Sequence, residues 1–461
     1  MSQRDRLSAG GDAERLYQSA GRLAALGRFE DAKADYLAAL AQAPTHFGAL
    51  NDLGTLLYQA EFRAAARTCY AEAVKHHPSQ PAGHINLANA LLANGEAGAA
   101  RGHYETALRL SPDHPDALQG MANLLQDQGD AITAGRYRQR SYGARRITML
   151  SCLGRSPAGC ILQLVSAVGG NVPTKGLLDR QAFDIAILAV ESRAAGEPLP
   201  PHDLVFNTVG DADLCGPALD AAEAMLARTS APVINPPSKV RSTGRAEIAE
   251  RLADLRGVIT PRVTRARRNG LAEAAKAFDY PFLMRTPGFH TGRNFVRVER
   301  RQDLDAAAAE LPGDELLLIQ YLDARGPAGQ SRKYRVMMID GGVYPLHLAI
   351  SDDWKVHYFT ADMAERPDHR AEEAAFLSNM AGVIGQTAVA GLEAIAARLG
   401  LDYGGVDFGL SPDGEVLVFE ANATMVINPP DADPRWDYRR APVQAALDAA
   451  RAMILRCAAR G

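Results

Sequence analysis

The chain has 461 residues, of which 47% are hydrophobic and 23% are charged, and its formal net charge is −4. This length predicts about three domains, and the weak charge gives no reason to expect a nucleic acid or an anionic membrane as partner. Five cysteines without a CxxC pair, no apolar signal region and no run of about 20 apolar residues favour a cytoplasmic protein with no membrane span, disulfide framework or zinc site.

The first third of the chain repeats with a period of 34 residues. Prolines end each unit at Pro44, Pro78 and Pro112, and one column holds only alanine: Ala32, Ala66, Ala100 and Ala134. Small side chains let paired helices approach closely, and proline ends the second helix. The pattern resembles the tetratricopeptide repeat family, which implies an all-α solenoid of four helical hairpins at 13–46, 47–80, 81–114 and 115–146. A disordered lead-in is expected over 1–12.

Helical hairpins of this kind bury their apolar faces against their neighbours and leave a concave groove. The resemblance therefore implies a surface that binds a peptide or protein. The candidate groove residues are asparagines, which either grip a peptide backbone or serve as local caps: Asn51, Asn86, Asn89 and Asn123.

Residues 147–236 alternate short apolar segments with helical ones, which predicts an open α/β sheet with parallel strands. Strands are expected at 147–150, 184–190, 204–209 and 233–234, and helices at 159–168 and 217–228. Polar side chains follow the strand at 204–209, at the sheet edge where such folds hold ligands: Asn207, Thr208 and Asp211.

Two further features suit a nucleotide. A strand at 280–285 ends in Arg285, and a loop from Gly288 to Gly292 separates it from a strand at 295–298. Such a loop either folds its N–H groups over phosphate oxygens or is a plain hairpin loop. An apolar strand at 316–323 runs into a joint whose backbone could read an adenine edge: Gln320, Tyr321, Leu322 and Asp323.

The strand expected at 333–339 places Lys333 and Arg335 on one face, which suits an anionic ligand. A strand at 343–350 follows. A helix is then expected over 372–399, with an interruption near the glycines at 382 and 385.

Residues 401–422 predict a β-hairpin around Asp413-Gly414. A two-residue turn there places Asp407 opposite Glu420, with Asn422 on the same face. Facing carboxylates repel each other. A Mg²⁺ ion between them would turn this repulsion into attraction, because Mg²⁺ prefers carboxylate and amide oxygens. The alternative to a metal site is that this face of the hairpin is simply exposed to solvent. Gly405 and Gly409 should leave room beside Asp407, and the opposite face should be core: Val406, Phe408, Leu410, Leu417, Phe419 and Ala421.

The order of these parts across 147–461 resembles the ATP-grasp ligases. Asp407 with Glu420-Ala421-Asn422 is similar to the magnesium ligands of that family, and Asn235-Pro236 is similar to the junction after its first subdomain. The resemblance implies an α/β pre-ATP-grasp subdomain at 147–236 and an α+β ATP-grasp domain at 237–461. In this sequence Arg245 and Arg285 replace two lysines of the family, and Gln320 replaces an acid.

The resemblance implies a ligase in which ATP, with Mg²⁺ or Mn²⁺, converts a small-molecule or peptide carboxylate to an acyl phosphate that an amine attacks. A homodimer is also implied. The residues carried over are Arg245, Arg285 and Gly288–Gly292 for the triphosphate; Gln320, Tyr321, Leu322 and Asp323 for the nucleoside; Arg335 for the transferring phosphoryl group; and Asp407, Glu420 and Asn422 for the metal. His347, Lys355 and His357 are weaker candidates for the acceptor site.

Two other functions stay open. An ATP-grasp kinase would stop at phosphoryl transfer. A repeat-bearing scaffold would bind nucleotide without turnover, which the two arginine-for-lysine replacements favour and the Asp/Glu/Asn set opposes.

Overall fold

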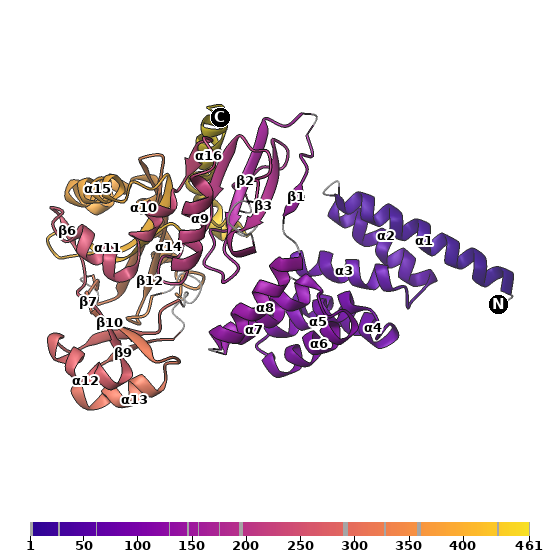
Figure 1. Ribbon diagram of the computed structural model, residues 1–461, viewed down its shortest axis with the longest axis horizontal. Coiled ribbons are helices and arrows are strands. Elements are labelled where there is room, and N and C mark those ends of the chain that lie inside the picture. The colour runs from indigo at the N-terminus through magenta and orange to yellow at the C-terminus, as the bar shows by residue number, and fades with distance from the viewer. Residues whose placement is uncertain are drawn as a thin grey trace. The chain divides into compact units, whose positions relative to one another are not determined.

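The computed structural model describes residues 3–25, 28–60, 62–128, 130–144, 147–154, 156–174, 176–192, 197–288, 294–326, 329–356, 361–430 and 433–460. The chain divides into two compact units, Met1–Arg145 and Arg146–Gly461. The first unit is helical, and the second is a mixed α/β unit with three sheets (Figure 1).

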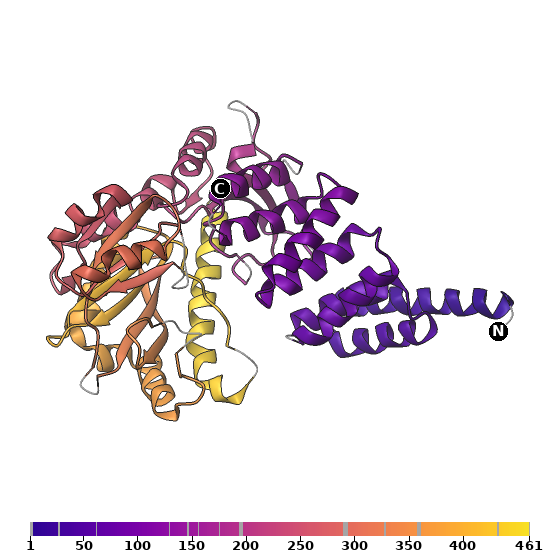
Figure 2. The ribbon, with the colours of Figure 1, turned by 90° about the horizontal axis from the view of Figure 1, so that it is seen from below.

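The first unit consists of successive helical hairpins (Figure 2). The helices are α1 (Gln3–Ala25), α2 (Phe29–Gln42), α3 (Phe47–Gln59), α4 (Arg63–His76), α5 (Pro81–Ala93), α6 (Ala97–Leu110), α7 (Pro115–Asp127) and α8 (Ala131–Ala144). Each predicted repeat holds one hairpin. Residues 3–12, predicted to be a disordered lead-in, instead form the first turns of α1.

The small residues of the 34-residue pattern lie where helices touch. The alanine column at 32, 66, 100 and 134 is fully buried. A Cβ added at Gly54 would lie 2.6 Å from the ring of Tyr70, and one added at Gly120 would meet the ring of Tyr104. Tight contact between glycine and tyrosine therefore fixes the distance between neighbouring helices.

The first sheet of the second unit has the order β1-β3-β2-β4-β5. Its strands are β1 (Thr148–Leu150), β2 (Gly159–Val165), β3 (Phe183–Ala189), β4 (Leu204–Asn207) and β5 (Val233–Ile234). All pairs are parallel except β1 with β3. Helix α9 (Gly216–Leu226) follows β4, and α10 (Pro237–Arg241) and α11 (Arg245–Leu252) follow β5.

The helix predicted at 159–168 is wrong, because this segment is strand β2. It lies between β3 and β4, and residues 161–165 are buried. A strand covered on both faces has no polar alternation, so its apolar run cannot be distinguished from a buried helix by pattern alone.

The second sheet is antiparallel with the order β7-β10-β8-β9. Its strands are β7 (Val263–Arg267), β8 (Phe282–Arg285), β9 (Phe295–Val298) and β10 (Glu315–Gln320). Helix α12 (Leu271–Ala274) packs on β7 and α13 (Leu304–Ala309) packs on β9 (Figure 1). Short 3₁₀ turns occur at Val190–Ser192, Arg268–Gly270, Ala275–Ala277, Arg301–Asp303 and Pro434–Trp436.

The third sheet has the order β12-β11-β13-β14-β6. Its strands are β6 (Val258–Ile259), β11 (Ser331–Ile339), β12 (Gly342–Ser351), β13 (Tyr403–Leu410) and β14 (Val416–Asn422). The helix expected over 372–399 is two helices, α14 (Pro367–Ser378) and α15 (Met380–Leu399). Gly385 of α15 has φ +81, which places the predicted interruption at a glycine.

Helix α16 (Asp437–Ala458) was not predicted. It contacts β2 and β5 of the first sheet and β11 and β12 of the third, and it is the long yellow helix in Figure 2. The side chain of Asn235 also joins these sheets, since its Oδ1 accepts from the backbone of Asp402 and Tyr403, both at 3.0 Å. The boundary expected at 236/237 thus lies inside one compact unit.

Among the described helices, α15 alone is long and apolar enough to cross a membrane. It packs against β12, β14, α11 and α14 in the second unit. Its buried side chains include Ile384, Leu392, Ile395 and Leu399, so one face of it packs on the core of this unit.

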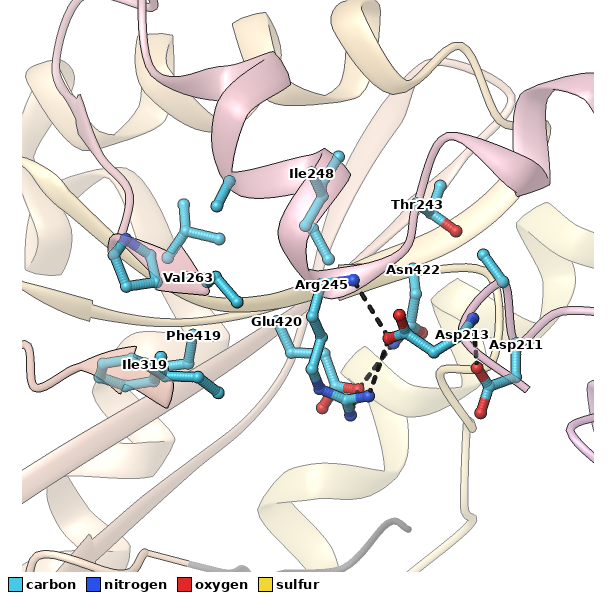
Figure 3. Close-up of a pocket in the computed structure, with 15 residues that line it drawn as sticks. Asp211, Asp213, Thr243, Arg245, Ile248, Val263, Ile319, Phe419, Glu420 and Asn422 are labelled. Atoms are coloured by element: carbon cyan, nitrogen blue, oxygen red, sulfur yellow. Dashed lines mark hydrogen bonds and ion pairs between the residues drawn. The ribbon is translucent and has the colours of Figure 1, made fainter. Parts of the chain in front are cut away.

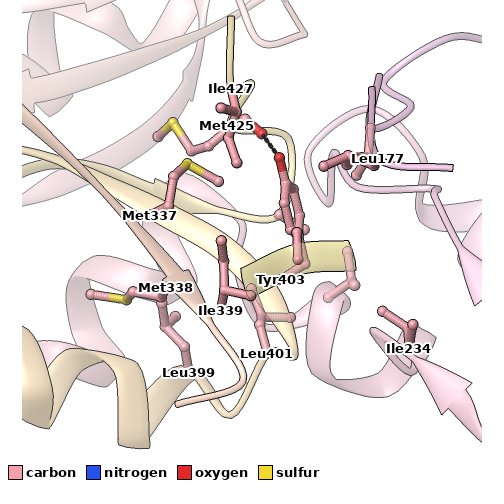
Figure 4. Close-up of a cluster of buried hydrophobic side chains, with 14 of the residues drawn as sticks. Leu177, Ile234, Met337, Met338, Ile339, Leu399, Leu401, Tyr403, Met425 and Ile427 are labelled. Carbon is pink, nitrogen blue, oxygen red and sulfur yellow. Dashed lines mark hydrogen bonds between the residues drawn. The ribbon is translucent and has the colours of Figure 1, made fainter. Parts of the chain in front are cut away.

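Tyr403, at the start of β13, lies in a cluster of buried hydrophobic side chains in the second unit (Figure 4). Tyr403 is 1% exposed, and its hydroxyl donates to the carbonyl of Met425 at 3.0 Å. Burial raises the pKa of this phenol, so it stays protonated as a donor. The bond fixes the segment that follows β14 and therefore the carboxyl end of the predicted metal hairpin.

Candidate functional site

A cavity of about 500 Å³ in the second unit is lined by residues of the second and third sheets. Its volume is in the range of small-molecule and cofactor sites. Among the described residues, six cationic side chains line it: Arg245, Arg285, Arg332, Lys333, Arg335 and Lys355. The only carboxylates among the described lining residues are Asp407 and Glu420. This excess of positive charge favours an anionic ligand.

The register of β13 with β14 brings the predicted metal ligands together. Asp407 lies opposite Glu420, as predicted, and Gly405 lies opposite Asn422. Below this point a bulge shifts the register, so that Phe408 pairs with Val418. The base of the hairpin is also not the two-residue turn expected from Asp413-Gly414, because the Ser411 amide donates to the Glu415 carbonyl at 2.9 Å.

The bulge also changes which side chains are core. Val416 and Val418 are buried in the main core cluster, and Leu417, which was expected to be core, is also buried. Phe419 instead lines the cavity. The burial predicted for Leu417 is confirmed, whereas the prediction that Phe419 is core is wrong because the bulge turns it toward the cavity.

The space predicted beside Asp407 is filled. A Cβ added at Gly405 would lie 2.9 Å from the side chain of Met425, and one added at Gly409 would meet Ala324 and Phe419. The two glycines therefore allow close packing and do not leave room for a ligand, which corrects the expectation.

Asp407 is 3% exposed and is held by two cations of β11. Arg335 contacts both of its oxygens, at 2.5 and 2.8 Å, and Lys333 lies at 3.1 Å. Burial alone would raise the pKa of Asp407, but Arg335 and Lys333 outweigh burial and hold this pKa well below its ordinary value. Lys333 and Arg335 thus share one face, as predicted.

Glu420 is held from the other side of the site by Arg245, the first residue of α11 (Figure 3). The Arg245 guanidinium lies 2.6 Å from Glu420 and 3.3 Å from Asp213. Asn422 donates to Glu420 at 2.8 Å, and its Oδ1 accepts from Thr424. A side cavity of about 30 Å³ next to Arg245 is too small for a nucleotide.

Asp213 was not predicted as a site residue, although Asp211 was. The Asp213 carboxylate accepts from the backbone and the side chain of Arg245 and from Arg265, at 3.1 to 3.3 Å. It is 4% exposed as a side chain. The sequence could have indicated Asp213 through its position two residues beyond Asp211, in the loop between β4 and α9. Asp211 itself accepts from the amides of residues 213 and 214.

Arg285 ends β8 and lies in the cavity wall, 5.3 Å from the ring centre of Phe295. Burial, followed by the charge of Arg245, lowers the pKa of Arg285 to about 10. Burial therefore costs this cation part of its solvation, and an anionic ligand in the cavity would offset that cost.

The segment predicted to bind the nucleoside, residues 320–323, lies only partly in the cavity wall. Gln320, Tyr321 and Leu322 line the cavity, whereas Asp323 does not. Asp323 forms a two-oxygen pair with Arg325, with Nε–O distances of 2.9 and 3.0 Å, and its contact with a ribose stays a prediction. Gln320 Oε1 accepts from the Arg262 amide at 3.1 Å.

The remaining predictions have mixed outcomes. Gly288 has φ +75 and approaches Leu214, but it is not in the cavity wall; Gly292 and His357 lie outside the described residues. Lys355 lines the cavity and donates to the Phe295 carbonyl at 3.2 Å. His347 is the cross-strand neighbour of Arg335; burial and then Arg335 lower the pKa of this imidazole well below its ordinary value.

The polar residues after β4 are structural. Asn207 donates to the Asn235 carbonyl at 2.8 Å, and Thr208 donates to the Leu164 carbonyl at 2.6 Å. Neither residue lines the cavity.

The donor set fits a hard cation in chemistry, since Asp407, Glu420 and Asn422 present carboxylate and amide oxygens to one cavity. Each is engaged by protein groups, so a metal ion would have to displace Arg335, Lys333 and Arg245 from the two carboxylates. No cluster of three His, Cys, Asp or Glu side chains suited to a metal occurs within the described part of the chain.

In the first unit, the asparagines at the predicted groove form hydrogen bonds with other side chains of the repeats. Asn86 donates to Asn51 at 2.8 Å, between α5 and α3, and Asn89 accepts from the Tyr104 hydroxyl at 2.5 Å. Asn123 accepts from Gln119 at 3.1 Å. Asn89 and Asn123 are exposed, whereas Asn51 and Asn86 are half-buried.

Residues 17–61 and 51–115 match the tetratricopeptide repeat family model, so the N-terminal region consists of these repeats. No curated protein matches the chain.

Three solved structures resemble part of the chain. PilF of Pseudomonas aeruginosa is 23% identical over 28% of this chain and 60% of its own, with a TM-score of 0.27. MamA from Desulfovibrio magneticus RS-1 is 22% identical over 29% of this chain and 76% of its own, also at 0.27. The first repeat domain of Spaghetti, bound to an HSP90 peptide, is 18% identical over 26% and 94%, at 0.25. The chain spans about three fifths of PilF.

Proposed function

We propose that the second unit is an ATP-dependent ligase that joins a carboxylate to an amine through an acyl phosphate, and that the repeats recruit a peptide or protein. One observation carries the proposal. A single cavity gathers three arginines, Arg245, Arg285 and Arg335, with the oxygens of Asp407, Glu420 and Asn422.

In the proposed reaction, the substrate carboxylate attacks the γ-phosphorus of ATP, the β–γ bond breaks and ADP leaves. The amine nitrogen then attacks the acyl carbon, inorganic phosphate leaves and the nitrogen loses a proton. Chemistry of this kind needs positioning and charge neutralisation more than covalent help from the protein.

The cations of the cavity supply that neutralisation. Arg245 and Arg285 come from α11 and β8 and bind the phosphates, and the planar guanidinium forks suit phosphate oxygens. Arg335 and Lys333 lie together on β11 and stabilise the transferring phosphoryl group. Asp213 fixes Arg245, since it accepts from both its amide and its guanidinium.

Magnesium would be held by Asp407, Glu420 and Asn422, where a bound ion supplies charge neutralisation of the phosphates. The arginines released from the two carboxylates would then face the phosphate oxygens.

The test is ADP release together with product masses, measured with ATP, Mg²⁺, a peptide mixture and the free amino acids. Wild-type protein should release ADP and yield a product with the mass of a condensation. Glu420→Gln should lower turnover by ~10²-fold or more. Glu415→Gln, a change in the same hairpin but outside the cavity wall, should leave it unchanged. Equal turnover in both variants would refute the metal assignment.

A scaffold that binds nucleotide without turnover is the second candidate. The observation that favours it is the pairing of Asp407 with Arg335 and Lys333, which a metal ion would have to break. Tight nucleotide binding without ADP would support the scaffold, and a stable phosphorylated product without condensation would support a kinase.

A further inference from the structure

Lys355 differs from the other cations of the cavity in its partner. Four of those cations form ion pairs with carboxylates: Arg245, Arg332, Lys333 and Arg335. Lys355 is half-buried, and its Nζ donates to the backbone carbonyl of Phe295 at 3.2 Å. Within the described ranges no carboxylate pairs with this ammonium group; the Asp353 carboxylate accepts from the Lys355 backbone amide instead. An anionic ligand would therefore supply a charged partner that these residues do not.

Lys355 also lies close to Arg285, because both contact Phe295. Phe295 faces Arg285 across the pair β8–β9, and the Arg285 guanidinium carbon is 5.3 Å from the Phe295 ring centre. In the proposed reaction the attacking carboxylate and the γ-phosphate are both anions and repel each other. A cation for each anion allows them to approach. With Arg285 on the phosphates, Lys355 is placed to hold the second anion beside them.

Two aromatic side chains line the cavity next to Lys355. The ring of Trp354 lies 5.4 Å from the ring of Phe295 in an edge-on contact, and both residues are in the cavity wall. The guanidinium carbon of Arg297 lies 5.4 Å from the Trp354 ring centre, although Arg297 does not line this cavity. Arg297 therefore packs on the indole from outside the wall. A flat apolar group of a ligand would find two aromatic contacts here.

We propose that Lys355 binds the carboxylate of the substrate that is to be phosphorylated, and that Phe295 and Trp354 contact an aromatic group carried by the same molecule. The inferred substrate class is an aromatic carboxylic acid. This inference rests on the proposed ligase function, because that function needs a carboxylate beside the γ-phosphate. In the ligand-free protein the Phe295 carbonyl holds the ammonium group of Lys355 at the cavity wall.

The test is a titration followed by the fluorescence of Trp354. The chain has two tryptophans, and Trp436 lies outside the cavity wall, so the full-length Trp436→Phe protein carries Trp354 as its single reporter. Mg²⁺ and a non-hydrolysable ATP analogue are present. The probes are benzoate, phenylacetate and 3-phenylpropionate, each with its uncharged amide, and acetate and propionate as acids without a ring.

At least one aromatic acid should change the fluorescence and bind ~10-fold or more tightly than its amide. The acids without a ring should displace it only at concentrations ~5-fold or more higher. Lys355→Met should weaken binding of the aromatic acid by ~10-fold or more, and Lys355→Arg, which keeps the charge, should retain most of it. Lys276→Met, which removes an exposed lysine outside the cavity wall, should leave it unchanged.

Isothermal titration of the ATP analogue without any acid separates the two claims. Analogue binding with no aromatic acid bound, or with acid binding that Lys355→Met keeps, overturns the carboxylate site and leaves the ligase proposal standing. Weaker analogue binding in Lys355→Met would make Lys355 a phosphate ligand, which also overturns the inference. No analogue binding in wild-type protein overturns the proposed function itself. Unchanged analogue affinity in Lys355→Met, together with weakened acid binding, is the expected result and excludes unfolding.

Discussion

Asp407 is both a counter-ion and the candidate metal ligand. Its side chain is 4% exposed, and its partners Arg335 and Lys333 are 21% and 15% exposed. A pair this buried costs much to desolvate, and removal of one member leaves the other charges without compensation. The stability of the unit should therefore depend on Asp407 even without a ligand.

Asp407→Asn should lower the free energy of unfolding by ~3–5 kcal/mol, because two buried cations lose their carboxylate. Urea unfolding followed by circular dichroism measures this. Asp254→Asn, which breaks the exposed pair with Arg398, should have a much smaller effect. A loss no larger than that of the control would mean that the pair contributes nothing to folding.

The same residue gives a pH dependence. The folded-state pKa of Asp407 is below its ordinary value, so the unfolded chain binds this proton more readily. The contribution is complete above the unfolded pKa of about 3.9 and disappears as the pH falls toward the folded value. The difference between wild type and Asp407→Asn should therefore shrink below about pH 4; a constant difference would contradict the assignment.

In contrast to Asp407, Arg285 should favour binding of the ATP analogue and lower the stability of the folded unit. Burial lowers its pKa to about 10, so the cation stays charged at neutral pH but is less stable in the folded protein than in the unfolded chain. Arg285→Met should weaken binding of the ATP analogue by ~10-fold or more, or about 1.4 kcal/mol, and should keep or raise the unfolding midpoint. Arg456→Met, which breaks an exposed pair with Asp340, should leave binding unchanged. A lower midpoint would make Arg285 a structural cation.

At the scale of the elements, the pairing of Asp407 with Glu420 in the hairpin of β13 and β14 was predicted correctly, although the turn length and a bulge were not. A two-residue turn predicts Asp407 opposite Glu420, but the real turn is longer by one residue. The bulge near Phe419 restores the predicted register at the site end alone. Turn residues in a sequence do not report a bulge further along the strand, so the pairing was predictable and the orientation of Phe419 was not.

Other misses have the same kind of cause. Strand β2 was predicted as a helix because it is buried on both faces. Helix α16, whose 22 residues contain Pro442, was not predicted, and it joins two sheets. Asp323 pairs through both oxygens with Arg325 two residues later, and the sequence did not predict this ion pair. Whether a local ion pair of this kind forms depends on side-chain geometry, which cannot be predicted from the spacing of residues in the sequence.

The repeat hairpins permit a test of helix spacing with an internal control. Gly120 of α7 faces the ring of Tyr104, whereas a Cβ at Gly102 of α6 would meet nothing within 4 Å. Gly120→Ala should destabilise the repeats by ~1–3 kcal/mol through overpacking. Gly102→Ala should stabilise them by ~0.5–1 kcal/mol through helix propensity. Thermal unfolding measures both, and equal shifts of the same sign would contradict the packing.

Helices α5 and α6 also share a histidine pair, with 3.0 Å between His84 Nδ1 and His103 Nδ1. Burial, followed by the charge of His84, lowers the pKa of His103. The unfolded chain therefore binds this proton more readily, so stability is full above about pH 6.5 and falls below it. Hydrogen exchange of α5 and α6, corrected for intrinsic rates, should rise in acid in wild type and rise less in His103→Gln. Identical pH profiles would exclude the pair as the cause.

At the scale of the whole molecule, two compact units have separate cores. A ligand that binds only the native second unit should stabilise that unit by RT ln(1 + [L]/Kd), about 2.7 kcal/mol at 100 times the Kd. Calorimetry with Mg²⁺ and the ATP analogue should shift one transition. Gly120→Ala should shift the other, which identifies it as that of the repeats. A nucleotide-dependent shift of the repeat transition would contradict separate folding.

The account depends on whether the cavity between the second and third sheets binds a nucleotide together with a metal ion. Isothermal titration of the ATP analogue with and without Mg²⁺ measures this directly in wild type, Glu420→Gln and Glu415→Gln. Binding should require Mg²⁺ and weaken by ~10-fold or more in Glu420→Gln, with Glu415→Gln like wild type. No binding in wild type, or binding that neither Mg²⁺ nor Glu420→Gln changes, would contradict it.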